Sequence, residues 1–129
     1  MEKVIVYQNQ KGNVSVCYPT GELPIEEVLT KDCPEGAVIV DAAALPQNDN
    51  DFFDAWRLVN GAIVVDLAAA KDIALWRFNN FAKDKADERA KNTAIGIEND
   101  VSDADFLKSL TAKRLEINTA TSTAELRNL

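Results

Sequence analysis

Because the sequence contains no histidine, the chemistry open to this chain is that of carboxylate, lysine or tyrosine side chains. Without histidine, Ser-His-Asp catalysis, Cys-His catalysis and His-ligated zinc are excluded, and the commonest general base is missing. The five glycines form neither a GxGxxG nor a GxxxxGK motif, which excludes a phosphate-binding loop. We therefore predict a protein that is not an enzyme and that holds no cofactor.

One acidic group, residues 48–51 (Asn-Asp-Asn-Asp) followed by Asp54, offers the oxygen ligands that calcium prefers. An EF-hand loop counted from Asn48 would need glycine at its sixth position and glutamate at its twelfth. This chain has Phe53 and Val59 there. The segment is therefore predicted to be a solvated loop without a metal.

A second acidic group precedes and opens a predicted helix; it consists of Glu98, Asp100, Asp103 and Asp105. Two of these carboxylates lie in the first helical turn, where the helix dipole favours negative charge. Helix capping accounts for the group, and we predict no metal site there either.

The two cysteines, Cys17 and Cys33, do not form a CxxC pair. The apolar run at the N-terminus is much shorter than a secretory signal. We expect free, buried thiols in a reducing cytosol. A Cys17–Cys33 disulfide remains an open alternative.

The two tryptophans each precede an arginine, in the pairs Trp56–Arg57 and Trp76–Arg77. Such pairs could stack nucleic-acid bases. However, the net charge of −7 opposes phosphate binding. We therefore expect both indoles to pack in the core, and we expect no nucleic-acid partner.

Charge is distributed unevenly along the chain. Residues 1–66 carry 4 basic and 11 acidic side chains, whereas residues 67–129 carry 10 of each. The acidic half keeps the protein soluble or favours a basic partner. No apolar run reaches the roughly 18 residues of a membrane span, so we expect no membrane association.

The elements that position these side chains change type near Asp66. Before it, alternating and β-branched patterns predict strands at residues 3–8, 14–18, 37–41, 55–59 and 62–66. A short helix begins near Pro24, and a polar loop covers residues 46–54. Asn60-Gly61 between two apolar runs is typical of a tight hairpin turn.

After Asp66, which is a suitable N-cap, 26 residues without glycine or proline predict one long helix that continues to about Asn92. An apolar stripe runs along its first half, but the second half, from Lys83, is polar and should extend outward. Capping boxes that start at Ser102 and Ser122 predict two further helices.

These patterns predict an α+β fold. A small antiparallel or mixed sheet with one helix (ββαβ plus a β-hairpin) is followed by a C-terminal helical hairpin. We place the domain boundary after residue 82, so that residues 1–82 form an α/β head and residues 83–129 a helical arm.

The middle of the chain resembles a diffuse group of small bacteriophage proteins encoded among virion and tail genes. The resemblance covers about residues 25–80, with the segments IEEVLTKDCPEG (25–36), IVDAAALP (39–46), FDAWRL (53–58) and VVDLAAAKDI (64–73). The Phe-x-Ala-Trp-Arg and Val-Asp-Leu portions are the most specific. Members often have histidine after the position of Ile73, where this chain has Ala74. The resemblance transfers no activity and no catalytic residue.

The resemblance implies a bacteriophage virion protein, tail- or capsid-associated, that acts through protein–protein contacts. Its partners would be other phage structural proteins or copies of itself, in an oligomeric assembly. The alternative is a soluble chaperone of tail or tail-fibre assembly, or an acidic host-directed inhibitor. Both hypotheses place the protein in the virion or the host cytoplasm. The candidate partner-binding residues lie on the predicted arm; they are Lys83, Arg89, Phe106, Leu110 and Leu115.

Overall fold

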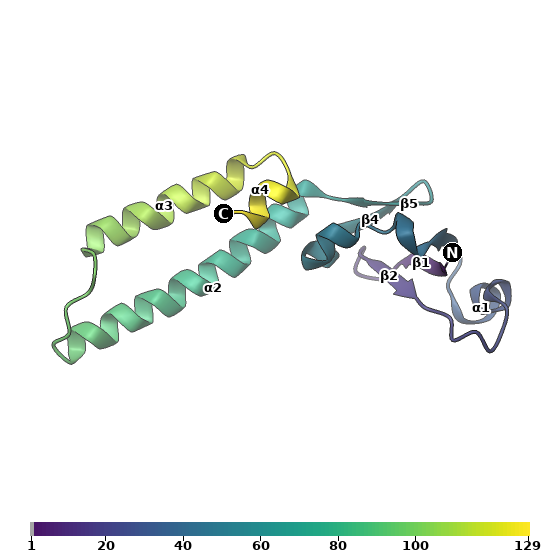
Figure 1. Ribbon diagram of the computed structural model, residues 1–129, viewed down its shortest axis with the longest axis horizontal. Helices are drawn as coiled ribbons and strands as arrows, with labels where there is room; N and C mark the ends of the chain where they lie inside the picture. Colours follow the sequence, from purple (N-terminus) through teal and green to yellow (C-terminus); the bar gives the residue numbers. More distant parts are fainter. Residues whose placement is uncertain (1) are drawn as a thin grey trace. The chain divides into compact units, whose positions relative to one another are not determined.

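The computed structural model describes residues 2–129 and has the predicted α+β fold (Figure 1). The chain divides into two compact units, of which the first ends at Ala70 and the second spans Lys71–Leu129. The division falls in the first turn of the long helix α2 (Leu67–Ala94), whereas the boundary predicted from the sequence lies after residue 82.

The first unit is built on a three-stranded antiparallel sheet of order β2-β1-β3, formed by β1 (Lys3–Gln8), β2 (Val14–Cys17) and β3 (Val38–Asp41). The turn between β1 and β2 is organised by Asn9, whose side-chain oxygen accepts hydrogen bonds from the backbone N–H groups of Lys11 and Asn13. The predicted ββαβ order is confirmed, with strand ends within one residue of the predicted positions.

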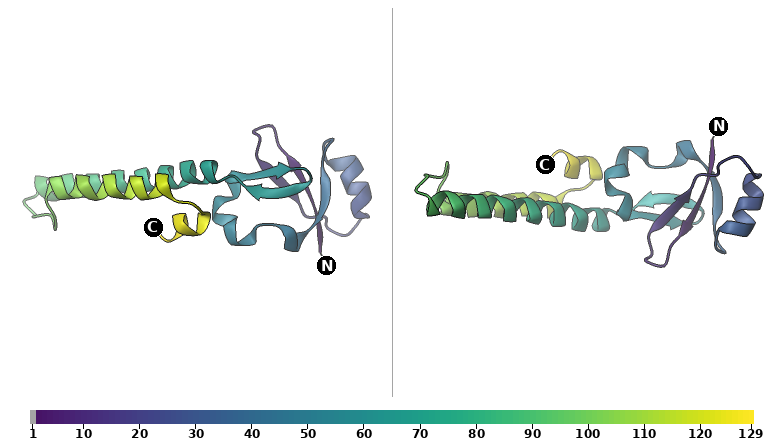
Figure 2. Two further views of the ribbon diagram at one scale, coloured as in Figure 1. Left: turned by 90° about the horizontal axis from the view of Figure 1, so that it is seen from above. Right: turned by 90° about the horizontal axis from the view of Figure 1, so that it is seen from below.

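The two faces of this sheet are covered by different elements. Val4, Val6 and Val14 on one face are buried against Leu45 and Trp56 and form the main core. The opposite face holds Ile5 with its two pairing neighbours, Cys17 and Ile39. Helix α1 (Ile25–Asp32) packs against β1, and Figure 2 shows it on the side of the sheet away from the β4–β5 hairpin.

The hairpin of β4 (Trp56–Val59) and β5 (Ala62–Val65) is confirmed, with Val59 paired to Ala62. Both turn residues have positive φ, 52° at Asn60 and 79° at Gly61. Two consecutive positive φ values define the type I′ turn that Asn-Gly sequences favour.

The predicted loop at residues 46–54 is wrong. This segment forms a kinked 3₁₀-helix, η2 (Gln47–Ala55), after a shorter one, η1 (Ala42–Ala44). Phe52 and Ala55 are buried, and the Trp56 indole N–H donates a hydrogen bond of 3.1 Å to the Asp49 carbonyl. Burial of these apolar side chains folds a segment whose composition is typical of a solvated loop.

The second unit contains helices, and its predicted start signals are largely confirmed. The long helix α2 (Leu67–Ala94) begins at Asp66, whose carboxylate accepts a hydrogen bond from the Ala69 N–H. Ser102 and Ser122 cap α3 (Asp103–Thr119) and α4 (Thr123–Arg127) through hydrogen bonds from the backbone N–H three residues later.

Glu125 departs from the expected capping box. Its carboxylate accepts hydrogen bonds from the backbone N–H and hydroxyl of Thr121, at 2.7 and 2.8 Å. A standard capping box would direct it to the N–H of Ser122 instead. The carboxylate thereby ties the start of α4 to the segment that follows α3.

Helices α2 and α3 run antiparallel and are joined by a loop (Figure 1). Long polar side chains link them along their length: Lys71 Nζ lies 3.0 Å from the Asn118 carbonyl, and Arg114 Nε lies 3.1 Å from Asn79 Oδ1. Ala82 and Ile117 are buried in this unit. Within residues 2–129, no helix combines the length and the apolar character that crossing a bilayer requires.

Candidate partner-binding surface

The five candidate partner-binding residues lie on both helices of the hairpin, and the structure gives them different surroundings. Lys83 and Leu115 are exposed, whereas Arg89, Phe106 and Leu110 are half-buried. The structure therefore does not gather the five into one continuous exposed patch.

Arg89 is the centre of a polar cluster within the chain. Its Nη2 lies 2.7 Å from Asp103 Oδ1 and 2.9 Å from the Val101 carbonyl oxygen, and its Nη1 lies 4.0 Å from Asp100 Oδ1. The guanidinium also lies 4.6 Å from the centre of the Phe106 ring, a cation–π geometry. Two of the predicted partner-binding residues, Arg89 and Phe106, are thus each other's neighbours inside the hairpin.

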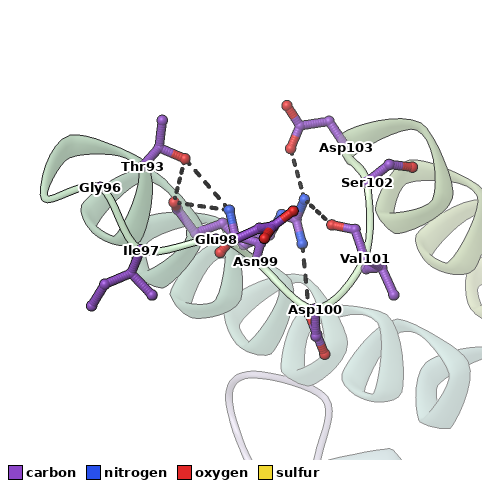
Figure 3. Close-up of a pocket in the computed structure, with 10 residues that line it drawn as sticks. Thr93, Gly96, Ile97, Glu98, Asn99, Asp100, Val101, Ser102 and Asp103 are labelled. Carbon is purple, nitrogen blue, oxygen red and sulfur yellow. Dashed lines mark hydrogen bonds and ion pairs between the residues drawn. The ribbon is translucent and has the colours of Figure 1, made fainter.

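The loop before α3 places the partners of Arg89 (Figure 3). Helix α2 ends where Gly96 adopts a φ of 78°, a left-handed conformation that glycine tolerates. The Asn99 amide then donates to the Arg89 carbonyl and to the Thr93 hydroxyl, both at 3.4 Å. These bonds fold the loop back over the last turns of α2, so that Asp100 and Asp103 face the guanidinium.

An open pocket of about 580 Å³ lies at this loop, with Arg89 and Asp103 among its lining residues. Three carboxylates of the second acidic group, Glu98, Asp100 and Asp103, line it. Across the part of the chain that the structure describes, no group of three or more acidic or cysteine side chains is arranged to hold a metal ion. Asp103 and Asp105 lie in the first turn of α3, as capping predicts.

Besides the polar cluster around Arg89, the α2–α3 hairpin has exposed apolar side chains. Leu115 is 63% exposed, and Leu107, two helical turns earlier on α3, is 62% exposed. On α2, Trp76 and Phe81 are exposed as well. The loop adds exposed side chains at Ile95, Ile97 and Val101.

The expectation that both tryptophans pack in the core holds for one of them. Trp56 is 2% exposed and packs against Phe53 in a tilted arrangement, with ring centres 4.8 Å apart, so its prediction is confirmed. Trp76 is 68% exposed, so its prediction is wrong. At 100° per residue, Trp76 lies on the side of α2 opposite to Phe78, whose ring lies 5.7 Å from the guanidinium of Arg114 on α3.

Sequence reasoning missed Trp76, Phe81 and Leu107 as surface residues because an apolar side chain on a helix is normally a core residue. One available signal was the width of the apolar face. The large apolar residues of 67–82 are distributed around most of the helix rather than along one stripe, which is more than a two-helix hairpin can bury.

The first acidic group, residues 48–51 with Asp54, lies on the 3₁₀-helix η2. Asp51 and Asp54 are exposed, and Asp49 is half-buried next to the bond from Trp56. Arg57 Nη1 donates to the Asp54 carbonyl at 2.8 Å and to Asn13 Oδ1 at 3.2 Å. The backbone of this acidic segment is therefore held in place by neighbouring side chains.

Comparisons with known proteins assign no family to the chain. No family model, no curated protein and no solved structure matches it.

Proposed function

We propose that this protein is a non-enzymatic bacteriophage component, associated with the tail or capsid of the virion, that acts through protein–protein contacts made by its α2–α3 hairpin. The observation that carries the proposal is the exposure of large apolar side chains along the hairpin and its loop. They are Trp76, Phe81, Ile95, Ile97, Val101, Leu107 and Leu115.

The burial pattern of the second unit supports a partner. Within Lys71–Leu129, the large apolar side chains that are buried are Ile117 and Leu126. A packed helical domain normally buries most of its large apolar side chains. Seven large apolar side chains of this unit's hairpin and loop are exposed instead. A partner that covers the hairpin would bury the apolar surface that the chain itself leaves in water.

The composition of this surface also suits an interface. Tryptophan, the residue most enriched at interaction hot spots, is exposed here at position 76. Lys83 and other charged residues of α2 surround the apolar positions, as in the polar rim of an interface. Residues 71–129 carry 10 basic and 10 acidic side chains, so this unit has no net charge to repel a partner of either sign.

The assignment to a phage particle is supported by the sequence resemblance, which covers α1, β3, the β4–β5 hairpin and the first half of α2. The resemblance indicates where the genes of similar proteins lie, among virion and tail genes, but it indicates no biochemical activity. The proposal therefore requires a test on particles.

Purified, washed virions test the assignment. We expect quantitative mass spectrometry to find this protein in a fixed ratio to the major structural proteins. Its absence from washed particles, together with its presence in the infected-cell lysate, would contradict a virion role and favour an assembly chaperone.

A matched pair of variants on α3 tests the surface. Leu115→Glu places a carboxylate at an exposed apolar position, whereas Ala112→Glu makes the same change at an exposed position that offers only a methyl group. We expect Leu115→Glu to reduce incorporation into particles about tenfold or more, the effect of losing a hot-spot contact, and Ala112→Glu to have little effect. Circular dichroism checks that both variants fold, and equal incorporation of the two would show that this surface is not the contact.

A further inference from the structure

Cys17 and Cys33 lie far apart in the sequence but are brought to the same face of the first sheet. Cys17, the last residue of β2, pairs directly with Ile5 of β1. Directly paired residues of neighbouring strands point to the same face. Ile5 is completely buried, although it points away from the valine core. The element that packs against β1 on this side is α1.

Cys33 terminates the element that covers this face. It is the C-cap residue of α1 and has an extended backbone, with φ −115° and ψ 148°. The end of α1 therefore brings Cys33 to the face of the sheet on which Cys17 lies. Figure 2 shows α1 next to the three-stranded sheet in both views.

The pKa of Cys33 depends on burial and on Cys17. Burial raises the pKa of the Cys33 thiol, and the charge of Cys17 raises it further. Both cysteines are free and half-buried, so a small oxidant can reach them.

We propose that Cys17 and Cys33 are an oxidisable thiol pair that closes to an intramolecular disulfide when the protein meets a small-molecule disulfide such as oxidised glutathione. One cysteine thiolate attacks a sulfur of glutathione disulfide and releases the first glutathione thiolate. The second cysteine thiolate then attacks the protein sulfur of the mixed disulfide and releases the second glutathione. The two protein thiols lose two electrons and two protons, and glutathione disulfide becomes two glutathione thiols.

The closed form would join the end of β2 to the end of α1. The segment between them, residues 18–32, contains the exposed turn around Gly21 and the whole of α1. A cross-link across a loop of this length removes conformational freedom from the unfolded chain. The disulfide would thereby fix α1 on the sheet under oxidising conditions, whereas the reduced pair leaves it held by packing alone.

Intact-mass measurement on the dilute wild-type protein tests the proposal directly. After incubation with glutathione disulfide, we expect the mass to fall by two hydrogen atoms, with no glutathione adduct and no dimer on a non-reducing gel. Peptide mapping should place the link between Cys17 and Cys33. Accumulation of a species with glutathione on both cysteines, or of an intermolecular dimer, would overturn the proposal, because it would show that the sulfurs cannot reach each other.

Thermal unfolding gives a second measurement. We expect oxidation to raise the Tm of the first unit by on the order of 10 °C and dithiothreitol to reverse the shift. Cys17→Ser and Cys33→Ser serve as matched controls, since neither variant should respond to oxidation in this way. An equal Tm for the oxidised and reduced wild-type protein would show that the link does not constrain the fold, and would contradict the stabilising role.

Discussion

At the scale of single residues, Arg89 shows that a candidate partner-binding side chain can also make contacts within its own chain. Its charge and position on a polar helix suggest a contact with a partner. In the structure, its side chain is only 12% exposed and contacts the carboxylate of Asp103 and the ring of Phe106. Its main role in the described fold is to join the end of α2 to the start of α3.

Replacement of Arg89 measures the strength of this junction. We expect Arg89→Ala to lower the free energy of unfolding of the second unit by about 1–2 kcal/mol, since it removes a cation–π contact and an ion pair with an exposed carboxylate. Urea unfolding followed at α3 is the measurement. Asp100→Ala, which removes a more distant partner at 4.0 Å, should have a much smaller effect. Equal losses for the two variants would contradict the central role of the guanidinium.

Glu125 is a residue whose pKa is lowered by its hydrogen-bond partners. Hydrogen bonds from the backbone N–H and the hydroxyl of Thr121 hold the pKa of Glu125 below its ordinary value of 4.5. A carboxyl group with a lowered pKa in the folded state stabilises that state above the unfolded pKa. The stabilisation is lost as the pH falls through the folded pKa. We therefore expect α4 to loosen in acid, below pH 4.5.

Carboxyl NMR titration of Glu125, together with amide shifts in α4, tests this expectation. The Glu125→Gln variant provides the control, because its neutral side chain should remove the acid dependence of α4. A Glu125 midpoint at or above 4.5 would contradict the hydrogen-bonded geometry.

At the scale of elements, the β4–β5 turn sets a strict requirement at one position. Gly61 has a φ of 79°, and a side chain there would be strained although no atom lies within 4 Å of its Cβ position. We expect Gly61→Ala to lower the free energy of unfolding of the first unit by more than about 1 kcal/mol.

The matched control for this turn is Asn60→Gly. It places glycine at the neighbouring left-handed position, where φ is 52°, and should be tolerated. Thermal unfolding of both variants is the measurement. A loss of stability for Asn60→Gly as large as that for Gly61→Ala would show that the turn depends on the Asn60 side chain rather than on backbone conformation.

Most elements could be predicted from the sequence because their signals are local. The Asn-Gly turn, the N-caps at Asp66, Ser102 and Ser122, and the alternation of strands β1 and β2 each depend on neighbouring residues. The 3₁₀-helix η2 could not be predicted, because its Phe52 and its bond to Trp56 act through burial against residues elsewhere in the chain. The exposure of Trp76 was missed for the same reason, since the depth of a helix in a core is not a local property.

At the scale of the whole molecule, the two units differ in how completely they are packed. The first unit holds Val4, Ile5 and Val6 at full burial in one strand. In the second unit, small side chains such as Ala82 occupy buried positions while Leu107 and Leu115 are exposed. Amide hydrogen exchange reports this difference, because protection follows the cost of local opening.

We expect amides of β1 to be protected much longer than amides of α3 in the dilute, isolated protein. The proposed virion contact predicts that α3 gains protection in assembled particles, because a partner there would cover the apolar side chains. Exchange measured by mass spectrometry on both forms tests this. Equal protection of β1 and α3 in the isolated protein would contradict the incomplete packing of the hairpin.

Because the hairpin is incompletely buried, the lifetime of the protein should depend on how many binding sites its partner offers. A partner that binds only the folded hairpin stabilises it by mass action, so its stability rises with the concentration of open sites. Copies made in excess would keep a hairpin that opens frequently, and frequent opening exposes a chain to proteolysis. The same exposed leucines and tryptophan that would hold the protein in a particle would then also mark surplus copies for removal.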